Sequence, residues 1–373
     1  MNQQEVNLKN PFVLYDKDYK TEYVSSVCSL NKGIIAKPVI EFEFDNIIGK
    51  TFKEIFSTKL LVSKMKDISK KFNVDLSGYD ENNLPEFLDL GLVSKDIRER
   101  EFSNYIVSEF GNRLGMIFLT LRSENDENKN ARKDWNDEHW QFWKNIKNVI
   151  LVGGLASGLI GRRFKEQIYS LFDKAGVEPY DITLFENGTY VGVQGCAKHL
   201  MKNDETCLVC DFGHTNIKRC IVEKRNDRIV SCAPLESLKS LYMNSEYDSV
   251  DKKRNDAILL HKSLVRLLSV SYKEKAETNN LSDEIIISIA NYTVRGKLNS
   301  VRGGYAKLSL LSDDYEKLLS RDVSSELHKN ISIKLVHDGT ANALCFSDIE
   351  NSVCISLGTS FGVGFPNIHI YCD

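Results

Sequence analysis

Residues 211–219, DFGHTNIKR, carry side chains suited to holding phosphate. They follow an apolar run that predicts a strand, so Asp211 lies where a strand delivers a carboxylate to a metal-bound nucleotide. Gly213 removes a side chain at the turn, and Thr215 and Lys218 offer a hydroxyl and a cation. The chemistry indicated is binding of a nucleoside triphosphate with Mg²⁺. The alternative is an ordinary hairpin in which these residues only form the turn.

A second carboxylate follows an apolar run in residues 335–344, LVHDGTANAL. Asp338 enters a Gly-Thr turn that leads into a run of small residues. A carboxylate at a strand end facing a phosphate loop can take a proton from a substrate hydroxyl. The alternative is that Asp338 only caps a helix that begins near Thr340.

Residues 353–364, VCISLGTSFGVG, form a third segment with this pattern. After an apolar strand, the backbone N–H groups around Gly358 and Gly362 can approach phosphate oxygens, and Thr359 or Ser360 can add a hydroxyl donor. The alternative is a plain β-hairpin.

The fourth segment, 149–161, VILVGGLASGLIG, predicts a strand, a turn at Gly153 and Gly154, and a helix that begins near Ser157 and is capped by it. Small residues at such a turn let an adenine and a ribose lie against the backbone. The alternative is a tight strand-to-helix turn with no ligand.

Hydrophobic periodicity predicts the elements that position these segments. We expect a hairpin of 207–211 with 218–223, a third strand near 228–233, a buried parallel strand over 284–290 and another strand over 334–336. Helices are expected over 51–72, 97–121 and 252–275, short strands between 12 and 56 (including 23–28 and 38–44), and an exposed loop or frayed helix over 122–140. We expect Trp135, Trp140 and Trp143 to anchor the helix that follows; the alternative is that they dock a partner.

Together the four segments resemble the nucleotide-binding motifs of the actin-like ATPase and sugar kinase superfamily, specifically its ROK branch (repressor, open reading frame, kinase). DFGHTNIKR resembles the D-x-G-G-T-N-x-K phosphate loop, with His214 in place of the second glycine. LVHDGTANAL is similar to the catalytic N-D-A-N-A-A-A-L, LGTSFGVG to L-G-T-G-x-G-G-G, and VILVGGLASG to the adenosine-binding I-V-x-G-G-G-x-S. Residues 184–200, LFENGTYVGVQGCAKHL, resemble the closing segment with its A-G-x-x-G-A-A core.

The order of these motifs differs from that of the family. The adenosine and closing segments come first here, and the second phosphate loop is almost last. This order predicts a circular permutation in which the natural termini are joined through 201–205 and the chain is cut after the second phosphate loop.

The resemblance implies an α/β fold with two ribonuclease-H-like (actin-like ATPase) domains and a nucleotide cleft between them, in circularly permuted order. One domain would comprise residues 1–200 plus 346–373 and carry the adenosine loop and the second phosphate loop. The other, 201–345, would carry the first phosphate loop and the sugar-facing side. The chain of 373 residues is long enough for two cores, and all four loops are expected to converge on the cleft.

The activity that the resemblance implies is phosphoryl transfer from ATP, with Mg²⁺, to a sugar hydroxyl of a hexose or amino sugar. Asp338 would accept the proton, and Asp211 would hold Mg²⁺ through water. The two phosphate loops would hold the phosphates, and His214 and Asn216 of the first loop would take part in this. Lys218 would either balance developing charge or lie on the surface.

The sugar-binding residues are less well defined by the resemblance. The E-x-G-H segment of the family does not occur in this sequence, and His337 and Thr340 replace the asparagines of N-D-A-N. Candidates for sugar contact, with ordinary loop residues as the alternative, are His337, Thr340, Asn291, Tyr292, Arg302, Gly304 and Tyr305.

Two other functions remain open on the sequence. His214 and the missing sugar and zinc motifs fit a nucleotide- or sugar-binding sensor or regulator that has lost transfer. An ATPase switch resembling the chaperone and actin members, in which water replaces the sugar, is the other.

The overall composition limits the partners that we expect. A net charge of −3 and a pI near 6.2 give no global attraction for nucleic acid or anionic membranes. No run approaches the roughly 18 apolar residues needed to span a bilayer, and the N-terminal residues lack an apolar signal core. We expect a cytoplasmic protein with a small-molecule sugar substrate. The family implies a possible homodimer.

Nine cysteines in largely apolar surroundings predict reduced, buried thiols. Cys207 and Cys210 have the spacing of a metal-binding pair, but the sequence offers no second pair, which favours a role in core packing. The zinc motif C-x-C-G-x-x-G-C-x-E of many ROK members does not occur, so no structural zinc is expected.

Overall fold

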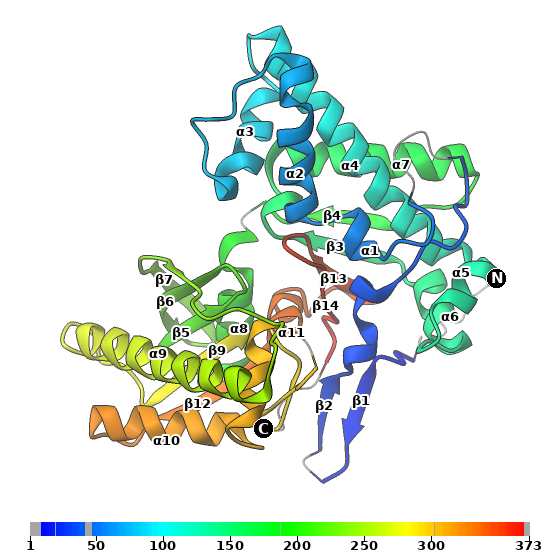
Figure 1. Ribbon diagram of the computed structural model, residues 1–373. Helices are drawn as coiled ribbons and strands as arrows, with labels where there is room; N and C mark the ends of the chain where they lie inside the picture. The colour runs from blue at the N-terminus through cyan, green and yellow to red at the C-terminus, as the bar shows by residue number, and fades with distance from the viewer. Residues whose placement is uncertain (1–8, 19, 42–46, 187, 302, 369–373) are drawn as a thin grey trace. The chain divides into compact units, whose positions relative to one another are not determined.

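The computed structural model describes residues 9–18, 20–41, 47–186, 188–301 and 303–368. These residues form α-helices and β-strands in mixed order, which makes the protein an α/β protein. They divide into two compact units (Figure 1). The first unit contains the described residues of Met1–Val13, Ser26–Thr189 and Ile349–Val363, and the second unit contains those of Leu14–Ser25, Tyr190–Asp348 and Gly364–Asp373.

The second unit is built on a mixed sheet with the strand order β12-β9-β5-β6-β7. Strands β5, β6 and β7 form an antiparallel meander, whereas β9 and β12 run parallel to β5. A short strand, β8, also pairs with β6. The bounds are β5 Glu205–Phe212, β6 Asn216–Arg225, β7 Arg228–Pro234, β8 Leu238–Lys239, β9 Glu284–Ile289 and β12 Ser332–His337.

Helices cover both faces of this sheet. Helices α9 (Val250–Ala276) and α10 (Tyr315–Leu327) lie side by side on one face (Figure 1), together with the 3₁₀ segment η7 (Gly304–Leu310). Helices α8 (Val191–Leu200) and α11 (Asp338–Leu344) pack on the other face. Strand β9 reads EIIISI because a parallel strand between two helical layers is buried on both sides. The prediction of a buried parallel strand here is confirmed.

The edge strand β12 is protected by side chains of α10. Its outward N–H groups at Ile333 and Leu335 donate to Ser320 Oγ at 3.0 Å and to Glu316 Oε2 at 2.7 Å. The N–H group of Ile331, just before the strand, donates to Ser324 Oγ at 2.9 Å. Since these three acceptors are four residues apart, they lie on one face of the helix. The helix therefore satisfies donors that an exposed sheet edge would leave open.

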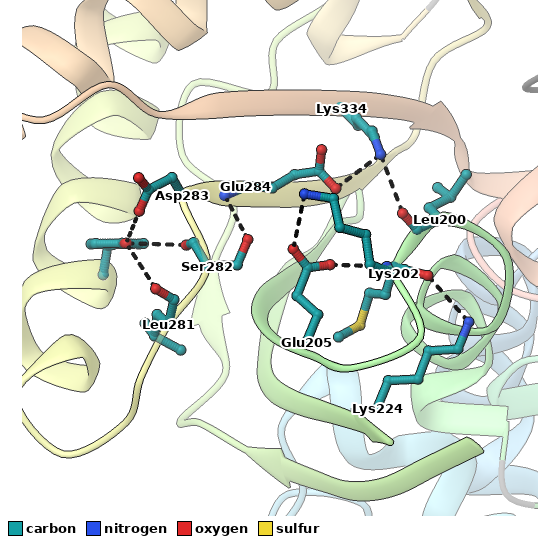
Figure 2. A network of polar contacts seen from close by, with 11 residues as sticks. Leu200, Lys202, Glu205, Lys224, Leu281, Ser282, Asp283, Glu284 and Lys334 are labelled. Atoms are coloured by element: carbon teal, nitrogen blue, oxygen red, sulfur yellow. Dashed lines mark hydrogen bonds and ion pairs between the residues drawn. The ribbon is translucent and has the colours of Figure 1, made fainter. Parts of the chain in front are cut away.

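Two lysines hold the connection from α8 to β5 (Figure 2). Lys224 Nζ donates to the main-chain oxygen of Met201 at 3.2 Å, and Lys334 Nζ donates to that of Leu200 at 3.2 Å. Glu205 accepts a hydrogen bond from the main-chain N–H of Lys202 at 3.0 Å. Cations at the carboxyl end of a helix are also favoured by its dipole. These contacts fix the segment at which the sequence predicts joined termini.

The first unit contains the sheet β14-β13-β3-β4. Strands β13 (Ser352–Ser356), β3 (Asn148–Val152) and β4 (Asp181–Leu184) are parallel, and β14 (Gly362–Gly364) lies beside β13. Helix α4 (Ile97–Ser123) packs closely on α7 (Gly158–Ala175), because Gly111 and Gly115 leave room for the α7 backbone. Shorter helices are α1 Phe52–Ile55, α2 Thr58–Ser69, α3 Leu84–Gly91, α5 Asp126–Ala131 and α6 Asp137–Asn145.

Several predicted elements need correction. The helix predicted over 51–72 is broken at Phe56, because Ser57 caps a new helix with its side chain. Residues 38–41 form no strand, and 42–46 lie outside the described residues. In the stretch predicted to be exposed, α5 forms, and Asn128 and Arg132 are buried. The prediction that the three tryptophans anchor a helix is confirmed by their burial.

Two short hairpins complete the second unit. Strands β1 (Val13–Asp16) and β2 (Thr21–Val24) form one of them, and β10 (Thr293–Val294) and β11 (Lys297–Leu298) form the other. Arg295 at the tip of the second hairpin forms ion pairs with Asp16 and Asp18 of the first.

Candidate functional site

Three parallel strands of the second unit end level with one another. Phe212 of β5 pairs with Ile289 of β9, and Ile289 pairs with His337 of β12. The carboxyl ends of parallel strands are where α/β proteins bind ligands. The segments DFGHTNIKR and LVHDGTANAL, which are more than a hundred residues apart in sequence, therefore start from one edge of this sheet.

Asp211 is held by two polar neighbours from adjacent strands. Ser288, its register partner on β9, donates its hydroxyl to Asp211 Oδ1 at 3.0 Å. Lys218, its register partner on β6, places Nζ 3.5 Å from Asp211 Oδ2. Ser288 was not predicted, because its sequence context, EIIISIA, reads only as a buried strand. The signal for it was its polarity within that apolar run.

Asp338 lies close enough to Asp211 for the two charges to interact. Burial and the Asp211 carboxylate raise the pKa of Asp338 to about 7. Its side chain is still 31% exposed, so a ligand can reach it. Asp338 Oδ1 accepts a hydrogen bond from the N–H of Gly339 at 2.7 Å. A carboxyl group with a pKa near neutrality is suited to accepting a proton from a hydroxyl.

His337, and not Asp338, caps helix α11, which begins at Asp338 rather than near Thr340. Nδ1 of His337 accepts the N–H of Thr340 at 3.3 Å and lies 3.2 Å from the Thr340 hydroxyl. The interpretation of Asp338 as a simple cap is therefore wrong, because the neighbouring imidazole fills that role. Thr340 is buried against this ring.

The turn after β5 is supported by the hydroxyl groups of the partly buried Ser240 and the buried Tyr305. The Gly213 carbonyl accepts hydrogen bonds from Ser240 Oγ at 2.7 Å and from Tyr305 Oη at 3.1 Å. The imidazole of His214 lies against Gly303, where a Cβ would come within 2.9 Å of its Nε2. The turn continues into Thr215 and Asn216, which are exposed, and Lys218, which is partly buried.

The structure places the sugar-contact candidates in different settings. Tyr305 is fully buried and uses its hydroxyl on the turn, so it supports the phosphate loop in this structure. Asn291 is buried and closes its own loop through two hydrogen bonds with the backbone of Asn299. Gly304 is buried against Met243, and Arg302 lies outside the described residues. Tyr292 remains partly exposed and stacks on His337, with ring centroids 4.2 Å apart.

Helix α8 reaches the site through two glycines of the closing segment. A Cβ on Gly195 would lie 1.9 Å from the carbonyl oxygen of Ala341, and one on Gly192 would lie 3.1 Å from Asn342 Oδ1 and 3.4 Å from Ser288 Oγ. The G-x-x-G spacing thus lets α8 pack directly on α11, which carries Asp338 at its start.

In the first unit, β3 and β13 also end level with each other, at Val152 and Ser356. Gly153 has φ +96°, and a Cβ there would lie 2.6 Å from the carbonyl oxygen of Leu357. Gly154 is exposed, and a Cβ there would meet no atom within 4 Å. The adenosine-type loop and the second phosphate-type loop therefore lie side by side within this unit.

The prediction that Ser157 caps the next helix with its side chain is wrong. Ser157 occupies the N-cap position of α7, but its hydroxyl donates to the carbonyl of Gly154 at 3.1 Å. Asp89 takes over the role, since its Oδ1 accepts the N–H of Ile160 at 2.9 Å.

The second phosphate-type loop exposes Thr359 and leaves Gly358 and Ser360 partly buried. The carbonyl of Gly358 accepts the N–H of Thr58 at 3.0 Å, which ties the loop to the start of α2. Gly362 donates its N–H to Ser356 Oγ at 3.2 Å. The last glycine of the segment, Gly364, belongs to the second unit, where a Cβ on it would meet the carbonyl oxygen of Gly339 at 1.8 Å.

The cysteine pair of β5 does not form a metal site. Cys207 and Cys210 are three residues apart on a strand, so their side chains enter the cores on opposite faces of the sheet. This confirms their role in core packing. Across the described ranges, no group of three or more His, Cys, Asp or Glu side chains is placed to hold a metal ion. None of the helices described there has the length and apolar character needed to cross a bilayer.

Comparison of this chain with known proteins identifies no family for it. No protein-family model and no curated protein matches the chain. Among solved structures, the crystal structure of ethanolamine utilization protein EutJ from Carboxydothermus hydrogenoformans is similar with a TM-score of 0.31 and 12% sequence identity, over 61% of this chain and 73% of that chain. A TM-score this low supports no inference about fold or function, so the proposals below rest on the residues of the chain itself.

Proposed function

We propose that the protein is an ATP-dependent phosphotransferase that phosphorylates a sugar hydroxyl, as the ROK-like motifs imply. The observation that carries this proposal is the pair Asp211 and Asp338. They come from two distant motifs and lie at the carboxyl ends of parallel strands of one sheet, where burial and the Asp211 carboxylate together raise the pKa of Asp338 to about 7. One carboxylate held by a lysine and a second one poised to accept a proton are the two acidic groups that such a reaction needs.

The topology of the second unit supports the fold that we propose. Three antiparallel strands followed by two parallel ones, in the order β7-β6-β5-β9-β12, are the arrangement of a ribonuclease-H-like layer. In the first unit, β13 comes from near the C-terminal end of the sequence, yet it pairs in parallel with β3. This pairing is what a circularly permuted order would produce. The permutation and the two-domain division remain part of the proposal.

The residues at this edge fit ATP with Mg²⁺. Asp211 supplies the hard carboxylate oxygens that Mg²⁺ prefers. Asp211 would hold Mg²⁺ through water. When bound, Mg²⁺ would neutralise phosphate charge.

Each residue of the second unit then has a defined task. Asp338 would accept the proton of the attacking hydroxyl, while Asp211, kept in place by Ser288 and Lys218, would position the phosphates. Backbone N–H groups of the turn and the exposed Thr215 hydroxyl would contact the phosphate oxygens. We propose that Gly153, Gly154, Gly358, Thr359 and Ser360 of the first unit bind the same nucleotide.

The proposal is tested by ADP release with a panel of hexoses and amino sugars, using Asp338→Asn as the control variant. We expect release that depends on one sugar class. The substitution should lower kcat about 10²–10⁴-fold, the contribution of a general base, and should leave ATP affinity within about threefold because Asp338 acts on the acceptor.

Two other outcomes would reject the kinase assignment. Release that needs no sugar would indicate an ATPase switch, and nucleotide binding without release under any condition would indicate a sensor. Equal activity of the wild type and the Asp338→Asn variant would remove Asp338 from the reaction.

A further inference from the structure

We propose that Ser240 and Tyr305 are positioning residues that turn the Gly213–His214 peptide so that the main-chain N–H of His214 donates to a phosphate oxygen. The inference rests on the proposed function for its ligand, because a nucleoside triphosphate supplies the phosphate. It deepens that function by assigning one donor of the turn and the side chains that aim it. Ser240 was not predicted as a site residue from the sequence, and Tyr305 was predicted as a sugar contact.

Two hydroxyl groups hold one carbonyl of the turn. Ser240 Oγ donates to the main-chain oxygen of Gly213 at 2.7 Å, and Tyr305 Oη donates to the same oxygen at 3.1 Å. A carbonyl oxygen has two lone pairs, so both hydrogen bonds can form together. The main-chain N–H of Ser240 also donates to the oxygen of Thr215 at 3.0 Å. These contacts therefore set the direction of the Gly213 carbonyl.

This carbonyl fixes the direction of the next N–H group. Among the described residues no peptide bond is cis, and in a trans peptide the N–H lies antiparallel to the C=O. Tyr305 belongs to the core between the sheet and helices α9 and α10, together with Phe212. Asp211 precedes Phe212 on β5, so its side chain lies on the opposite face of the sheet. The N–H of His214 therefore points away from the core of Tyr305, toward the side on which Asp211 lies.

The side chain of His214 lies on the same side as Tyr305. A Cβ on Gly303 would come within 2.9 Å of Nε2 of His214, and the imidazole is centred 6.2 Å from the ring of Tyr305. Gly303 precedes η7 and has φ +78°, so a side chain is disfavoured there by backbone conformation as well as by space. The imidazole is thus accommodated beside η7. The histidine that replaces a glycine of the family motif is therefore compatible with phosphate binding by the backbone of the turn.

A buried lysine holds the segments of Ser240 and Tyr305 together. The side chain of Lys307 on η7 is 1% exposed, and a buried ammonium group needs acceptors. Its Nζ donates to the main-chain oxygen of Tyr242 and to that of Asn244, the latter at 2.9 Å. Both acceptors follow Ser240 in the segment between β8 and α9, whereas Lys307 follows Tyr305 in η7. The two hydroxyl donors therefore come from segments that are joined to each other.

The first test measures binding of ATP–Mg²⁺ by calorimetry in Ser240→Ala, in Tyr305→Phe and in their double variant. Either hydroxyl alone can hold the carbonyl, so each single substitution should raise Kd by less than about threefold. Without both hydroxyls the peptide can rotate, and Kd should rise about tenfold, the effect of losing one hydrogen bond to a charged group. Ser240→Thr combined with Tyr305→Phe keeps one hydroxyl and should bind as Tyr305→Phe does.

The matched control removes a serine hydroxyl and a tyrosine hydroxyl that do not contact the turn. Ser309 Oγ donates to a carbonyl of its own 3₁₀ segment at 2.8 Å, and Tyr315 Oη lies 3.0 Å from Nδ1 of His261 in the same core. Ser309→Ala combined with Tyr315→Phe should keep the Kd of the wild type even if it lowers Tm. Wild-type affinity in the double variant of the turn residues, or an equal loss of affinity in the control, would overturn the inference.

The second test observes the donor itself and needs no kinase activity. In protein with ¹⁵N-labelled histidine, the main-chain amide signal of His214 is assigned by its loss in His214→Asn. It should shift on addition of inorganic tripolyphosphate with Mg²⁺, whereas the amide of His261, within α9, should not. Binding of tripolyphosphate without a shift of the His214 amide would contradict the inference.

The two proposals fail in different ways. If the wild type binds ATP–Mg²⁺ but phosphorylates no sugar, the proposed function fails, while the two tests still decide on the role of Ser240 and Tyr305. If the wild type is a sugar kinase and the His214 amide does not respond to the ligand, only the present inference fails. A wild type that binds neither ATP–Mg²⁺ nor tripolyphosphate would overturn both.

Discussion

At the scale of single residues, the site depends on two carboxylates at the same end of the sheet: Asp211 on β5 and Asp338 directly after β12. Asp211 has a lysine and a serine beside it, and its charge adds to the effect of burial in raising the pKa of Asp338. Asp338 carries the raised pKa, because burial and the Asp211 carboxylate both disfavour its charged form, so the two acids are assigned different tasks by their surroundings. The same logic separates acids from bases in many enzymes.

The raised pKa of Asp338 predicts the pH dependence of activity. With a pKa of about 7, the carboxylate form that can accept a proton is lost as the pH falls below neutrality. We expect kcat/KM for the sugar to fall about tenfold per pH unit below about pH 7. The measurement is a pH–rate profile of the wild type. An acid limb near pH 4, the ordinary range of a carboxyl group, would show that Asp338 is not the essential base.

Folding stability provides an independent check of the same shift. Because the folded pKa lies above the ordinary 3.8, the folded protein keeps a proton between about pH 4 and 7 that the unfolded chain releases. Asp338 therefore lowers the free energy of unfolding as the pH rises through this window. Asp338→Asn should be more stable than the wild type at neutral pH, by about 1 kcal/mol after allowance for its exposure, and the difference should vanish near pH 4.

At the scale of elements, helices complete the hydrogen bonds that strands leave open. Helix α10 accepts the outward N–H groups of the edge strand β12. Helix α8 packs through Gly192 and Gly195 on α11, the helix that starts at Asp338. The sheet edge can thus present Asp338 from a rigid support.

This support predicts a measurable loss of stability. In Ser320→Ala/Ser324→Ala, the buried N–H groups of Ile333 and Ile331 lose their acceptors. The free energy of unfolding should fall by about 2–4 kcal/mol, the cost of two unsatisfied buried donors. Urea unfolding measures it, and Ser325→Ala, at an exposed position of the same helix, is the matched control. Equal stability of the two variants would show that the serines do not protect the edge.

At the scale of the whole molecule, each unit carries loops at the carboxyl ends of its own parallel strands. The sheet of the first unit is assembled from distant parts of the sequence, since β13 pairs with β3. If both units serve one nucleotide, a substitution in either unit should weaken its binding.

Gly154→Leu in the first unit and Asp211→Asn in the second test this prediction. No atom lies within 4 Å of a Cβ at Gly154, so a leucine there should leave the fold intact and obstruct only a ligand. Bound ATP–Mg²⁺ at a hundred times its Kd should stabilise the wild type by about 2.7 kcal/mol, and each variant should lose most of this gain. Gly78→Leu, at another open glycine, is the control. If Gly154→Leu binds ATP as the wild type does, the first unit does not contact the nucleotide.

The sequence by itself determined the local elements and the two motifs of the second unit. Apolar periodicity predicted three strands: the one that carries Asp211, the buried strand EIIISI and the one before Asp338. It could do so because burial on one or both faces of a sheet leaves a direct pattern in the residues. The helix break at Ser57 and the ordered α5 did not follow, because side-chain caps and the burial of Asn128 and Arg132 depend on partners far along the chain.

Only the tertiary structure decided which groups meet at the site. Ser288 reaches Asp211 through strand register, Tyr305 turns inward to support Gly213, and His337 caps α11 while Nε2 faces Asp338. These contacts join segments that are distant in sequence or fix the orientation of a ring. Neither can be predicted from residue type and spacing. Hydrogen bonds are directional and short, so the chemistry of this site depends on the packing that brings its donors and acceptors together.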